Sequence, residues 1–384
     1  MIKYKKFLSA KPLFYKEIDY DRMPSIWKKI KQYVKLPKTI HVIGTNGKGT
    51  TGRYLANLLK KQGLIIAHYS SPHILKFNER VWINGENASD KALENAHKFL
   101  FSILDKNDLE ALSYFEYTTL LAMKLFEKCD FAILEAGMGG EYDATAVFDN
   151  ILTLVTPIDY DHQEFLGDTI KKIAQTKLNS IQKYAIVGKQ HFQEVYNIAE
   201  RLSKIKHFKV YRFEELLDDK DKRYIDNFAN FHNLPIFLRD NFSLALSAYK
   251  YLGFSIDKLD FEVPVIMGRC QKIAQNITID VGHNVLAANA LKKYFGNKKV
   301  ILVYNSYKDK DYKQILQILK PIIKRVEILK VKNNRIEKEE TLKENIIKMG
   351  LEAGNFIKFE DEEDYLIFGS FSVVEEFLRN FFEK

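Results

Sequence analysis

The sequence predicts an α/β fold with two domains, and three observations support this prediction. Short apolar runs alternate with segments of helical period along most of the chain, as in parallel sheets covered by helices. The 384 residues exceed the ~250–300 at which a single core stops growing. The stretch from Val263 to Arg269 interrupts the alternation. We expect a domain with a mainly parallel sheet in residues 1–267, a linker in 268–276 and a Rossmann-like α/β domain in 277–384.

Composition and charge narrow the class of protein. A hydrophobic content of 46% and a charged content of 28% are globular values, and no apolar run approaches the ~20 residues of a membrane helix. The basic N-terminal stretch lacks the apolar core of a secretory signal. Cys129 and Cys270 form no metal or disulfide pattern, which fits a reducing cytoplasm. The net charge of +9 is spread along the chain, so we expect no nucleic-acid or membrane partner.

The stretch from Thr39 to Tyr69 indicates a strand, a glycine-rich turn, a helix and a second strand. Gly44, Gly47 and Gly49 let backbone N–H groups approach an anion, and the helix adds the positive end of its dipole. Lys48 supplies a point charge for a polyphosphate. The spacing G-x-x-G-K-G-T is shorter than the general P-loop pattern. We interpret the turn as a phosphate loop, with an ordinary strand-to-helix turn as the alternative.

Polar residues follow several of the expected strands. The run Asp130–Ala136 carries Glu135 in an apolar setting, where a carboxylate needs a partner or a metal. The run Ile151–Thr156 is followed by two aspartates and by His162. Because ligands bind at the carboxyl ends of parallel strands, these groups are expected to meet at one edge. With hydroxyls from Thr50 and Ser71, they form a candidate Mg²⁺ site; for His162 alone, a surface role is the alternative.

The remaining elements are expected from periodicity and from turn signals. An Asn-Gly turn closes the strand Asn78–Gly85. The runs HFKVYRF and LPIFL are β-like and surround LLDDKDKR, which we interpret as a solvated turn. Asp240–Leu252 is expected to be a helix with Asn241 in its first turn. Further strands are expected at Leu64–Tyr69, Tyr184–Gly188, Ile277–Val281, Val300–Val303, Val326–Lys330 and Phe356–Lys358, and further helices at Asp21–Val34, Ser89–Leu104, Tyr114–Lys128, Phe192–Ser203, Asn284–Phe295 and Tyr312–Leu319.

Several ordered segments carry uncommon residues at regular separations. They are HVIGTNGKGTT (His41–Thr51), YSSPHILKFNERVWING (Tyr69–Gly85), SYFEYTT (Ser113–Thr119), ILEAGMGGEYDAT (Ile133–Thr145), DYDHQEFLGDTIKKIAQTK (Asp159–Lys177), GRCQ (Gly268–Gln271), DVGHN (Asp280–Asn284) and KDKD (Lys308–Asp311). In this order they resemble the folylpolyglutamate synthase and dihydrofolate synthase family of the Mur ligase superfamily. The resemblance runs through most of the chain.

The resemblance implies an ATP-dependent ligase with an N-terminal P-loop ATP-binding domain and a C-terminal glutamate ligase domain. ATP phosphorylates a carboxylate of dihydropteroate or of a reduced folate, and the amine of L-glutamate attacks the acyl phosphate. It implies ATP and Mg²⁺, with two metal sites, as cofactors. We expect a cytoplasmic protein that is a monomer.

The resemblance also assigns roles to residues of this chain. Lys48, His162 and Lys177 would be catalytic, and Lys177 would carry a carbamate that bridges to a metal. Magnesium would be bound by Ser71, Glu135, His162 and Lys177. ATP would be bound by Thr45, Asn46, Gly47, Lys48, Gly49, Thr50, Asn241, Arg269, Asp280 and His283. The pterin substrate would be bound by Ser113, Tyr114, Phe115, Glu116, Tyr142, Asp143 and Ala144, although Tyr114 and Phe115 fit core positions equally well.

The chain departs from the family pattern at several places. The family usually has arginine after the double glycine, where this chain has Glu141, and asparagine after Asp-Ala-Thr, where it has Ala146. The usual glutamate before the modified lysine is Thr176 here. The usual alanine-glycine after it is Leu178-Asn179. Substrate contacts near Glu141 are therefore expected to differ.

Two competing functions remain. A cell-wall precursor ligase of the same superfamily is the nearer one, but only 43 residues precede Gly44, which is short for an additional nucleotide-sugar-binding domain. A P-loop protein that uses nucleotide as a switch is the other. The convergence of Glu135, His162 and Lys177 favours the ligase.

Overall fold

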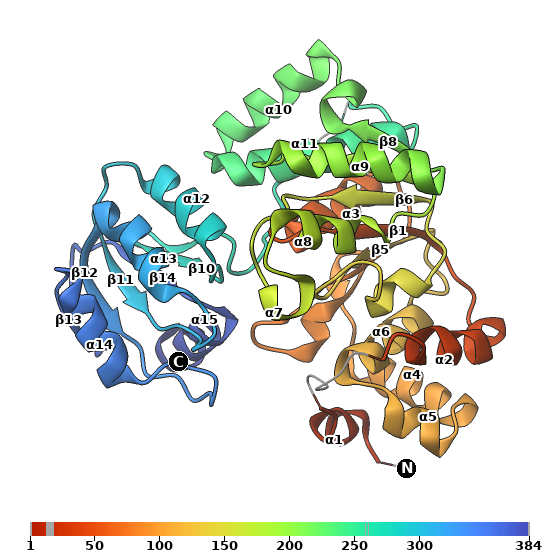
Figure 1. Cartoon of the computed structure of the whole chain (residues 1–384), viewed down its shortest axis with the longest axis horizontal. Helices are drawn as coiled ribbons and strands as arrows, with labels where there is room; N and C mark the ends of the chain where they lie inside the picture. Colours follow the sequence, from red (N-terminus) through yellow and green to blue (C-terminus); the bar gives the residue numbers. More distant parts are fainter. Residues whose placement is uncertain (1, 13–18, 258, 260, 383–384) are drawn as a thin grey trace. The chain divides into compact units, whose positions relative to one another are not determined.

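The computed structural model of the chain describes residues 2–12, 19–257, 259 and 261–382 (Figure 1). The chain divides into two compact units. The first unit comprises residues 1–71, 77–228 and 239–264, and the second comprises 72–76, 229–238 and 265–384. The second unit thus contains the chain from residue 265 onward, together with the two short earlier segments 72–76 and 229–238.

Among the described residues of the first unit, eight strands form one sheet in the order β4-β3-β2-β5-β1-β6-β7-β8. Neighbours from β2 to β8 run parallel, whereas β3 and β4 add an antiparallel edge. The strands are β1 (Lys38–Ile43), β2 (Ile66–Tyr69), β3 (Val81–Ile83), β4 (Glu86–Asn87), β5 (Phe131–Glu135), β6 (Leu152–Val155), β7 (Tyr184–Val187) and β8 (Lys209–Arg212). The mainly parallel sheet expected from the sequence is confirmed.

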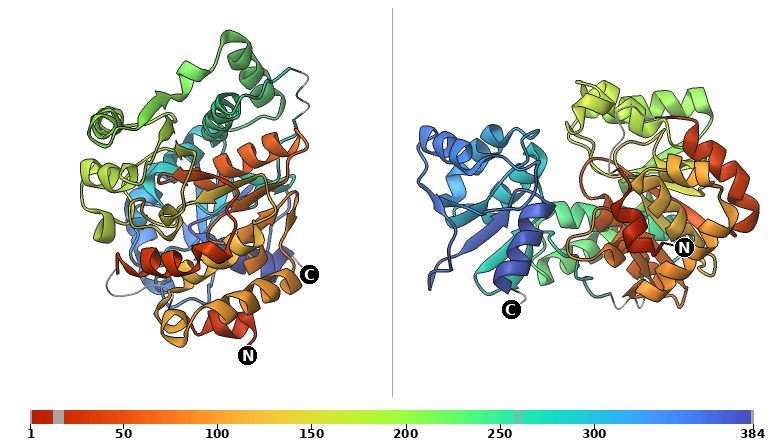
Figure 2. Two further views of the ribbon diagram at one scale, coloured as in Figure 1. Left: turned by 90° about the vertical axis from the view of Figure 1, so that its right-hand side faces the viewer. Right: turned by 90° about the horizontal axis from the view of Figure 1, so that it is seen from below.

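Helices cover both faces of this sheet: two hydrophobic cores lie side by side on one face, and α3 packs on the opposite face against His68 and Ile133 (Figures 1 and 2). One core joins Ala67, Tyr69, Ala132 and Leu134 of the sheet to apolar residues of α1, α2, α4 and α6. Another core joins Ile43, Val155, Ala185 and Val187 to α8 and α9. The helices of this unit are α1 (Tyr4–Ser9), α2 (Arg22–Ile30), α3 (Lys48–Lys60), α4 (Asp90–Ile103), α5 (Lys106–Ala111), α6 (Tyr114–Leu125), α7 (Gln163–Leu166), α8 (Ile170–Leu178), α9 (Gln193–Lys206), α10 (Asp219–Phe231) and α11 (Ile236–Tyr251). The last residues of α10 and the first of α11 belong to the second unit.

In the second unit, six strands of the described chain form a sheet in the order β13-β12-β11-β14-β10-β9. Strand β9 is antiparallel to β10, and the others are parallel. Helices α12, α13 and α14 pack on one face, and α15 packs on the other. The elements are β9 (Gln271–Ala274), β10 (Ile277–Asp280), α12 (Val285–Phe295), β11 (Val300–Tyr304), α13 (Tyr312–Leu319), β12 (Ile323–Ile328), α14 (Glu339–Lys348), β13 (Ala353–Asn355), β14 (Tyr365–Phe368) and α15 (Phe371–Phe377).

Several local predictions were wrong: for example, the strand expected at Asn78–Gly85 begins only at Val81, because Phe77–Arg80 form a 3-10 helix. LPIFL enters α11, so Asn241 lies in the second turn of that helix, and DKDKR begins α10. Both runs open helices whose buried residues lie mostly further along the chain, which a short window does not see. Phe356–Lys358 is no strand; β13 ends at Asn355. Strand β9 lies inside the expected linker 268–276.

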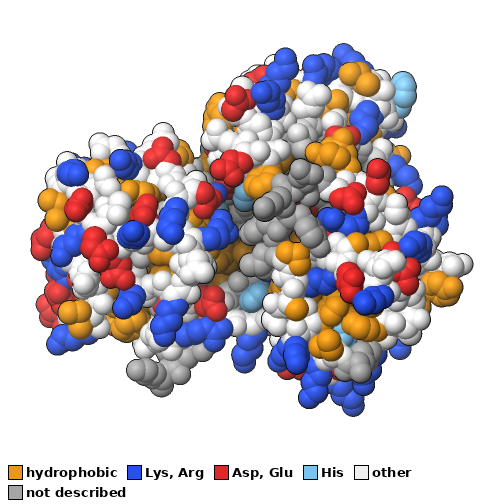
Figure 3. Space-filling model, turned by 60° about the horizontal axis from the view of Figure 1, so that its bottom comes forward, with side chains coloured by type: hydrophobic (Ala, Val, Ile, Leu, Met, Phe, Trp, Pro, Cys, Tyr) orange, Lys and Arg blue, Asp and Glu red, His pale blue; other side chains and the backbone are white. Residues whose placement is uncertain are grey.

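Charge and hydropathy give two further facts about the described residues. None of their helices is long and apolar enough to span a membrane. On the visible face in Figure 3, Lys and Arg side chains are interspersed with Asp and Glu.

Candidate active site

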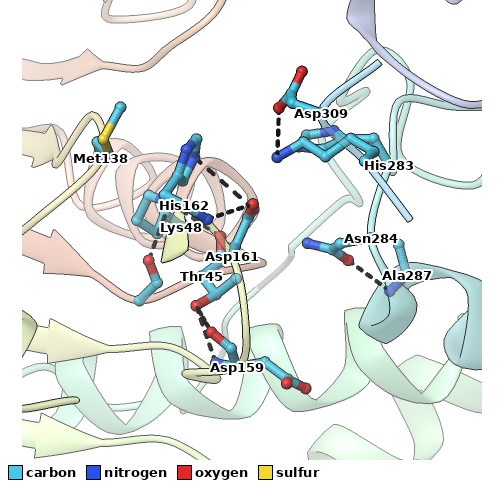
Figure 4. Close-up of polar contacts among 12 residues, drawn as sticks. Thr45, Lys48, Met138, Asp159, Asp161, His162, His283, Asn284, Ala287 and Asp309 are labelled. Carbon is cyan, nitrogen blue, oxygen red and sulfur yellow. Dashed lines mark hydrogen bonds and ion pairs between the residues drawn. The ribbon is translucent and has the colours of Figure 1, made fainter. Parts of the chain in front are cut away.

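The phosphate loop connects β1 to α3 in a conformation that depends on glycine. Gly44 and Gly47 have φ of 141° and 87°, which disfavour L side chains. A Cβ on Gly44 would overlap Thr156, and one on Gly47 would overlap the side chain of Asn241. Thr45 N donates to Pro157 O at 2.8 Å, and Thr45 Oγ1 donates to Asp159 O at 3.0 Å (Figure 4). The loop is therefore held against the segment that follows β6.

Lys48 is the first residue of α3, and its ammonium lies over the loop. Its Nζ donates to Gly44 O at 3.2 Å and to Thr45 O at 3.1 Å. Asn241, which is 5% exposed, packs against Gly47. The sequence placed Lys48 and Asn241 at the same nucleotide site, and the structure brings both to this loop. The loop and the start of α3 thus have the geometry of a cradle for an anion, and the loop with the start of α3 is called the cradle below.

Glu135 ends β5 beside this cradle. Its side chain is buried, its Oε2 accepts a hydrogen bond from Ser71 N at 3.1 Å, and the same oxygen would lie 3.0 Å from a Cβ on Gly49. Thr50 Oγ1 is a buried hydroxyl that has no hydrogen-bond partner among the described residues. A buried carboxylate and an unsatisfied hydroxyl at a phosphate loop fit a hard divalent cation. Among the described residues, no group of three or more His, Cys, Asp or Glu side chains is placed to hold a metal ion by itself.

His162 follows Asp161 where the chain leaves β6. It has φ of 50° and precedes α7. Its backbone N donates to Asp161 Oδ1 at 2.9 Å, and its Nε2 lies 3.9 Å from Asp161 Oδ2 (Figure 4). The His162 side chain is 36% exposed, whereas that of Asp161 is 9% exposed. Asp161 thus orients His162; the expected site set did not include Asp161, although its place directly after a strand was a usable signal.

Lys177 lies on α8 and is buried. Its Nζ donates to Gly44 O at 3.0 Å and to Met138 O at 2.8 Å. Burial, reinforced by the charge of Lys48, lowers the pKa of Lys177 to about 7. The lysine therefore joins the phosphate loop to the residues after β5, and its pKa lies in the range where an amine can exist unprotonated.

Residues Gly137 to Asp143, here called the glycine loop, follow β5. The Asp143 carboxylate accepts four hydrogen bonds, from Gly137 N at 2.8 Å, Met138 N at 3.2 Å, Thr145 N at 3.0 Å and Thr145 Oγ1 at 2.6 Å. His41 Nε2 lies 2.9 Å from Thr145 Oγ1. Since that hydroxyl donates to Asp143, it accepts from His41, which is therefore protonated on Nε2. Asp143 thus shapes the loop in this structure.

The residues expected to bind the pterin differ in their surroundings. Ser113 and Glu116 form a capping box at the start of α6, and Glu116 also accepts from Arg22 Nε at 2.9 and 3.1 Å. Tyr114 and Phe115 pack partly buried against the core, and Ala144 is buried in it. Tyr142 is 54% exposed, with its ring centroid 4.1 Å from that of Tyr20. Of this set, Tyr142 is the side chain most accessible to a ligand.

Three expected nucleotide ligands lie in the second unit, at the end of β10. Asp280 accepts from Cys270 N at 2.8 Å and from Gly282 N at 2.7 Å. Burial raises the pKa of Asp280, and the Arg269 guanidinium opposes this shift. His283 Nδ1 lies 3.2 Å from Val281 O, and Asn284 caps α12 through Ala287 N (Figure 4). Arg269 thus lies close to Asp280, and His283 follows Asp280 three residues later.

A second group of residues near the cradle was missed by sequence reasoning. Arg53 on α3 donates from Nε to His68 Nδ1 at 3.1 Å, and its guanidinium lies 4.6 Å from the centre of the Trp82 ring. Burial lowers the pKa of Arg53 to about 10, and the charge of Glu135 raises it in part. No local motif marks this contact, because its members lie on α3, β2 and β3.

Comparison with known proteins agrees with this geometry. The family model "Mur ligase middle domain" matches residues 42–215. A dihydrofolate synthase/folylpolyglutamate synthase of Haemophilus influenzae is 34% identical over 349 residues, covering 80% of this chain and 77% of that protein. The crystal structure of Helicobacter pylori folylpolyglutamate synthetase has a TM-score of 0.78 and 39% identity, covering 99% and 98%.

A further solved structure supports the fold alone. It is that of E. coli FolC in complex with DHPP and ADP, with a TM-score of 0.81 and 24% identity over 97% of this chain and 95% of that one. The cradle, the buried carboxylate beside it and the extent of these matches lead to one assignment. This chain belongs to the folylpolyglutamate synthase and dihydrofolate synthase family of the Mur ligase superfamily.

Proposed function

We propose that this protein is an ATP-dependent ligase that adds L-glutamate to dihydropteroate, to the γ-carboxylate of reduced folates, or to both. A carboxylate oxygen of the pterin substrate attacks the γ-phosphorus of ATP, the bond to ADP breaks, and an acyl phosphate forms. The amine of L-glutamate then attacks the acyl carbon, phosphate leaves with the bonding electrons, and the nitrogen loses a proton. The products are an amide, ADP and phosphate.

The observation that supports this reaction is the grouping of Lys48, Glu135 and Lys177 around one phosphate loop. Lys48 holds positive charge against the phosphates and stabilises the charge that spreads over them during transfer. The N-terminus of α3 offers its backbone N–H groups to the same anion. Lys177, with a pKa of about 7, is unprotonated in a substantial fraction of the molecules at neutral pH.

We propose that Mg²⁺ is held in two sites by five residues, which are Thr50, Ser71, Glu135, His162 and Lys177. When bound, the metal neutralises phosphate charge during transfer. Glu135 keeps its carboxylate at the end of β5 through the hydrogen bond from Ser71 N. Asp161 holds His162 at the edge of the sheet.

Carbamylation of Lys177 is a separate proposal. A carbamate would replace an ammonium by an anionic oxygen ligand for Mg²⁺. A pKa of about 7 supports it, because only the unprotonated amine reacts with CO₂. We expect kcat to rise with bicarbonate and the intact protein to carry the mass of one CO₂. Turnover that is independent of bicarbonate, with an unmodified mass, would count against the carbamate.

For the substrates, we propose that Tyr142 contacts the pterin and that Arg269, Asp280, His283 and Asn241 contact ATP. Tyr142 supports this because its ring is exposed beside the glycine loop. We also propose that the protein is a cytoplasmic monomer. Light scattering after gel filtration tests the oligomeric state.

The function is tested by measuring ADP release when the protein is given ATP, L-glutamate and either dihydropteroate or tetrahydrofolate. We expect turnover that needs both a pterin and L-glutamate. Comparing the two pterins gives the balance of activities. ATP hydrolysis without a pterin would favour a nucleotide switch, and turnover only with a cell-wall precursor would favour the other ligase class.

The Lys48→Ala variant tests the assignment of the phosphate loop. Because a charge that stabilises the transition state is lost, kcat should fall by about a hundredfold or more. Lys61→Ala is the matched control, since Lys61 is an exposed lysine just after α3. Equal turnover of both variants would show that the reaction uses another site.

A further inference from the structure

The glycine loop is attached to the end of α8 at Glu141. Glu141 N donates to Thr176 O at 3.1 Å, and Asn179 Nδ2 donates to Glu141 Oε2 at 2.8 Å. The first bond uses main-chain atoms and fixes where the loop passes. The second is a side-chain bond to a carboxylate, which is stronger than a neutral hydrogen bond. Both partners of this second bond are partly buried.

The loop and the helix also touch directly beside this pair. Gly140 lies so close to Lys177 that a Cβ on residue 140 would overlap the Lys177 main chain. Ser180 Oγ donates to Lys177 O at 2.8 Å from the other side. The backbone of Lys177 is therefore enclosed by the glycine loop and by the residues that end α8.

The same lysine contacts the phosphate loop through its side chain. Lys177 Nζ donates to Gly44 O and to Met138 O, the latter within the glycine loop. A shift of the glycine loop away from α8 would have two effects at once. It would move Met138 O away from Lys177 Nζ, and it would expose the Lys177 backbone. The contact between Glu141 and Asn179 therefore lies between the glycine loop and the helix that carries Lys177.

Glu141 and Asn179 are 38 residues apart in the sequence, and the structure brings them into one hydrogen bond. Thr176, three residues before Asn179, supplies the carbonyl that Glu141 N contacts.

We propose that Glu141 and Asn179 are positioning residues for the ligase reaction: their side chains fasten the glycine loop to α8 and so hold Lys177 at the phosphate loop. This inference rests on the proposed function for its kinetic effects. The proposal differs from two other roles in what it predicts. If Glu141 bound substrate, its substitution would affect the reaction independently of Asn179. If Asn179 served only the end of α8, its substitution would have an effect independent of Glu141.

The test is a double-mutant cycle with Glu141→Ala, Asn179→Ala and the double variant. Each single variant should lower kcat about five- to tenfold, the size expected for losing one ordinary intramolecular hydrogen bond. The double variant should lose no more than either single one, because the bond is already broken. The KM values for ATP and L-glutamate should change less than twofold. Glu141→Gln keeps an acceptor oxygen and should retain most of the activity.

Asn380→Ala is the matched control. Asn380 Nδ2 donates to Glu376 Oε1 at 2.7 Å, an exposed bond of the same chemistry in the second unit. Its kcat should equal that of the unsubstituted protein. Additive losses in the cycle, a raised KM for the pterin in Glu141→Ala alone, or unchanged kcat in both single variants would each overturn the proposal.

Hydrogen exchange separates this inference from the proposed function, because it needs no turnover. Peptides that cover residues 137–145 should exchange faster in Glu141→Ala and in Asn179→Ala than in the unsubstituted protein and in Asn380→Ala. Unchanged exchange would overturn the proposal even for an active enzyme. If the unsubstituted protein shows no pterin-dependent turnover, faster exchange still supports the fastening, and the proposed function fails instead.

Discussion

At the scale of single residues, His41 shows how burial in β1 keeps a titratable side chain neutral. His41 donates from Nε2 to Thr145, and its Nδ1 has no partner among the described residues. Burial lowers the pKa of His41 to about 4, although the charge of Asp143 raises it in part. A proton on Nδ1 would have no acceptor, so folding excludes the charged imidazole.

This histidine makes stability depend on pH. In the unfolded chain its pKa is ~6.5, so between pH 6.5 and 4 the unfolded state binds the proton and the folded state does not. The free energy of unfolding should therefore fall by about 3 kcal/mol as pH decreases through this window, whereas above pH 6.5 His41 is neutral in both states and lowers stability by nothing. Urea unfolding of the unsubstituted protein and of His41→Asn, at chosen pH values of 7.5, 5.5 and 4, measures how the difference in their free energies of unfolding changes with pH.

The two stability curves should converge as pH falls, because the variant lacks the group that takes up the proton. His68 is also buried and its pKa is also lowered, but it is present in both proteins, so its effect cancels in the difference between the two curves. Parallel curves would show that His41 is not the group responsible.

At the scale of elements, the N-terminus of α6 shows how a motif can have a structural purpose. Ser113 Oγ accepts from Glu116 N at 3.1 Å, and Glu116 Oε2 accepts from Ser113 N at 2.7 Å. Arg22 of α2 adds two hydrogen bonds to the same carboxylate. The side chains of Arg22 and Glu116 are 13% and 11% exposed. The pair therefore joins α2 to α6 within the first unit.

Removing one partner of this pair should destabilise the first unit. Arg22→Met leaves the Glu116 carboxylate desolvated, at a cost of about 3 kcal/mol, and Ser113→Ala removes a helix cap, at about 1 kcal/mol. The double variant Arg22→Met/Glu116→Gln should recover part of the loss, because no charge is left uncompensated. Fluorescence of Trp27 and Trp82 during urea unfolding reports on this unit, since both lie in it.

Lys106→Met is the control for that series. Lys106 and Glu110 form an exposed pair on α5, with 86% and 67% exposed side chains, so its loss should change stability by less than about 0.5 kcal/mol. Equal effects of Arg22→Met and Lys106→Met would contradict a supporting role for Arg22.

The elements also show the limits of local pattern reading. The parallel strands were predicted because β-branched and apolar residues concentrate there, and the Asn84-Gly85 turn followed from its residue types. The run LPIFL was misread because its β-branched and aromatic residues favour a strand. Its helical conformation comes from packing within α11, whose later residues Leu244, Ala245 and Ala248 are buried.

At the scale of the whole molecule, the expected nucleotide ligands are divided between the two units. Lys48, Glu135 and Asn241 belong to the first, whereas Arg269, Asp280 and His283 belong to the second. We expect a non-hydrolysable ATP analogue with Mg²⁺ to raise the melting temperature, because a ligand at a hundred times its Kd adds about 2.7 kcal/mol of stability.

Variants from both units should reduce this thermal shift. Lys48→Ala should remove most of it, Glu135→Gln should remove the part that depends on Mg²⁺, and Arg269→Ala should reduce it without abolishing it. Differential scanning calorimetry with Mg²⁺ or with a chelator measures each effect. A shift that is the same with and without Mg²⁺ would contradict the assignment of Glu135.

The sequence by itself determined the family, the two-domain α/β class and the phosphate loop, because these depend on local periodicity and on motifs of adjacent residues. Tertiary structure alone decided what many of the motif residues contact. Asp143, expected to meet substrate, is occupied by the backbone of its own loop, and Lys177 bridges two loops. In the sequence, Glu141 and Asn179 are two separate departures from the family pattern, and only the folded structure joins them by a hydrogen bond. Hydrogen-bond partners far apart in sequence are set by how the elements pack, and no local pattern encodes that geometry.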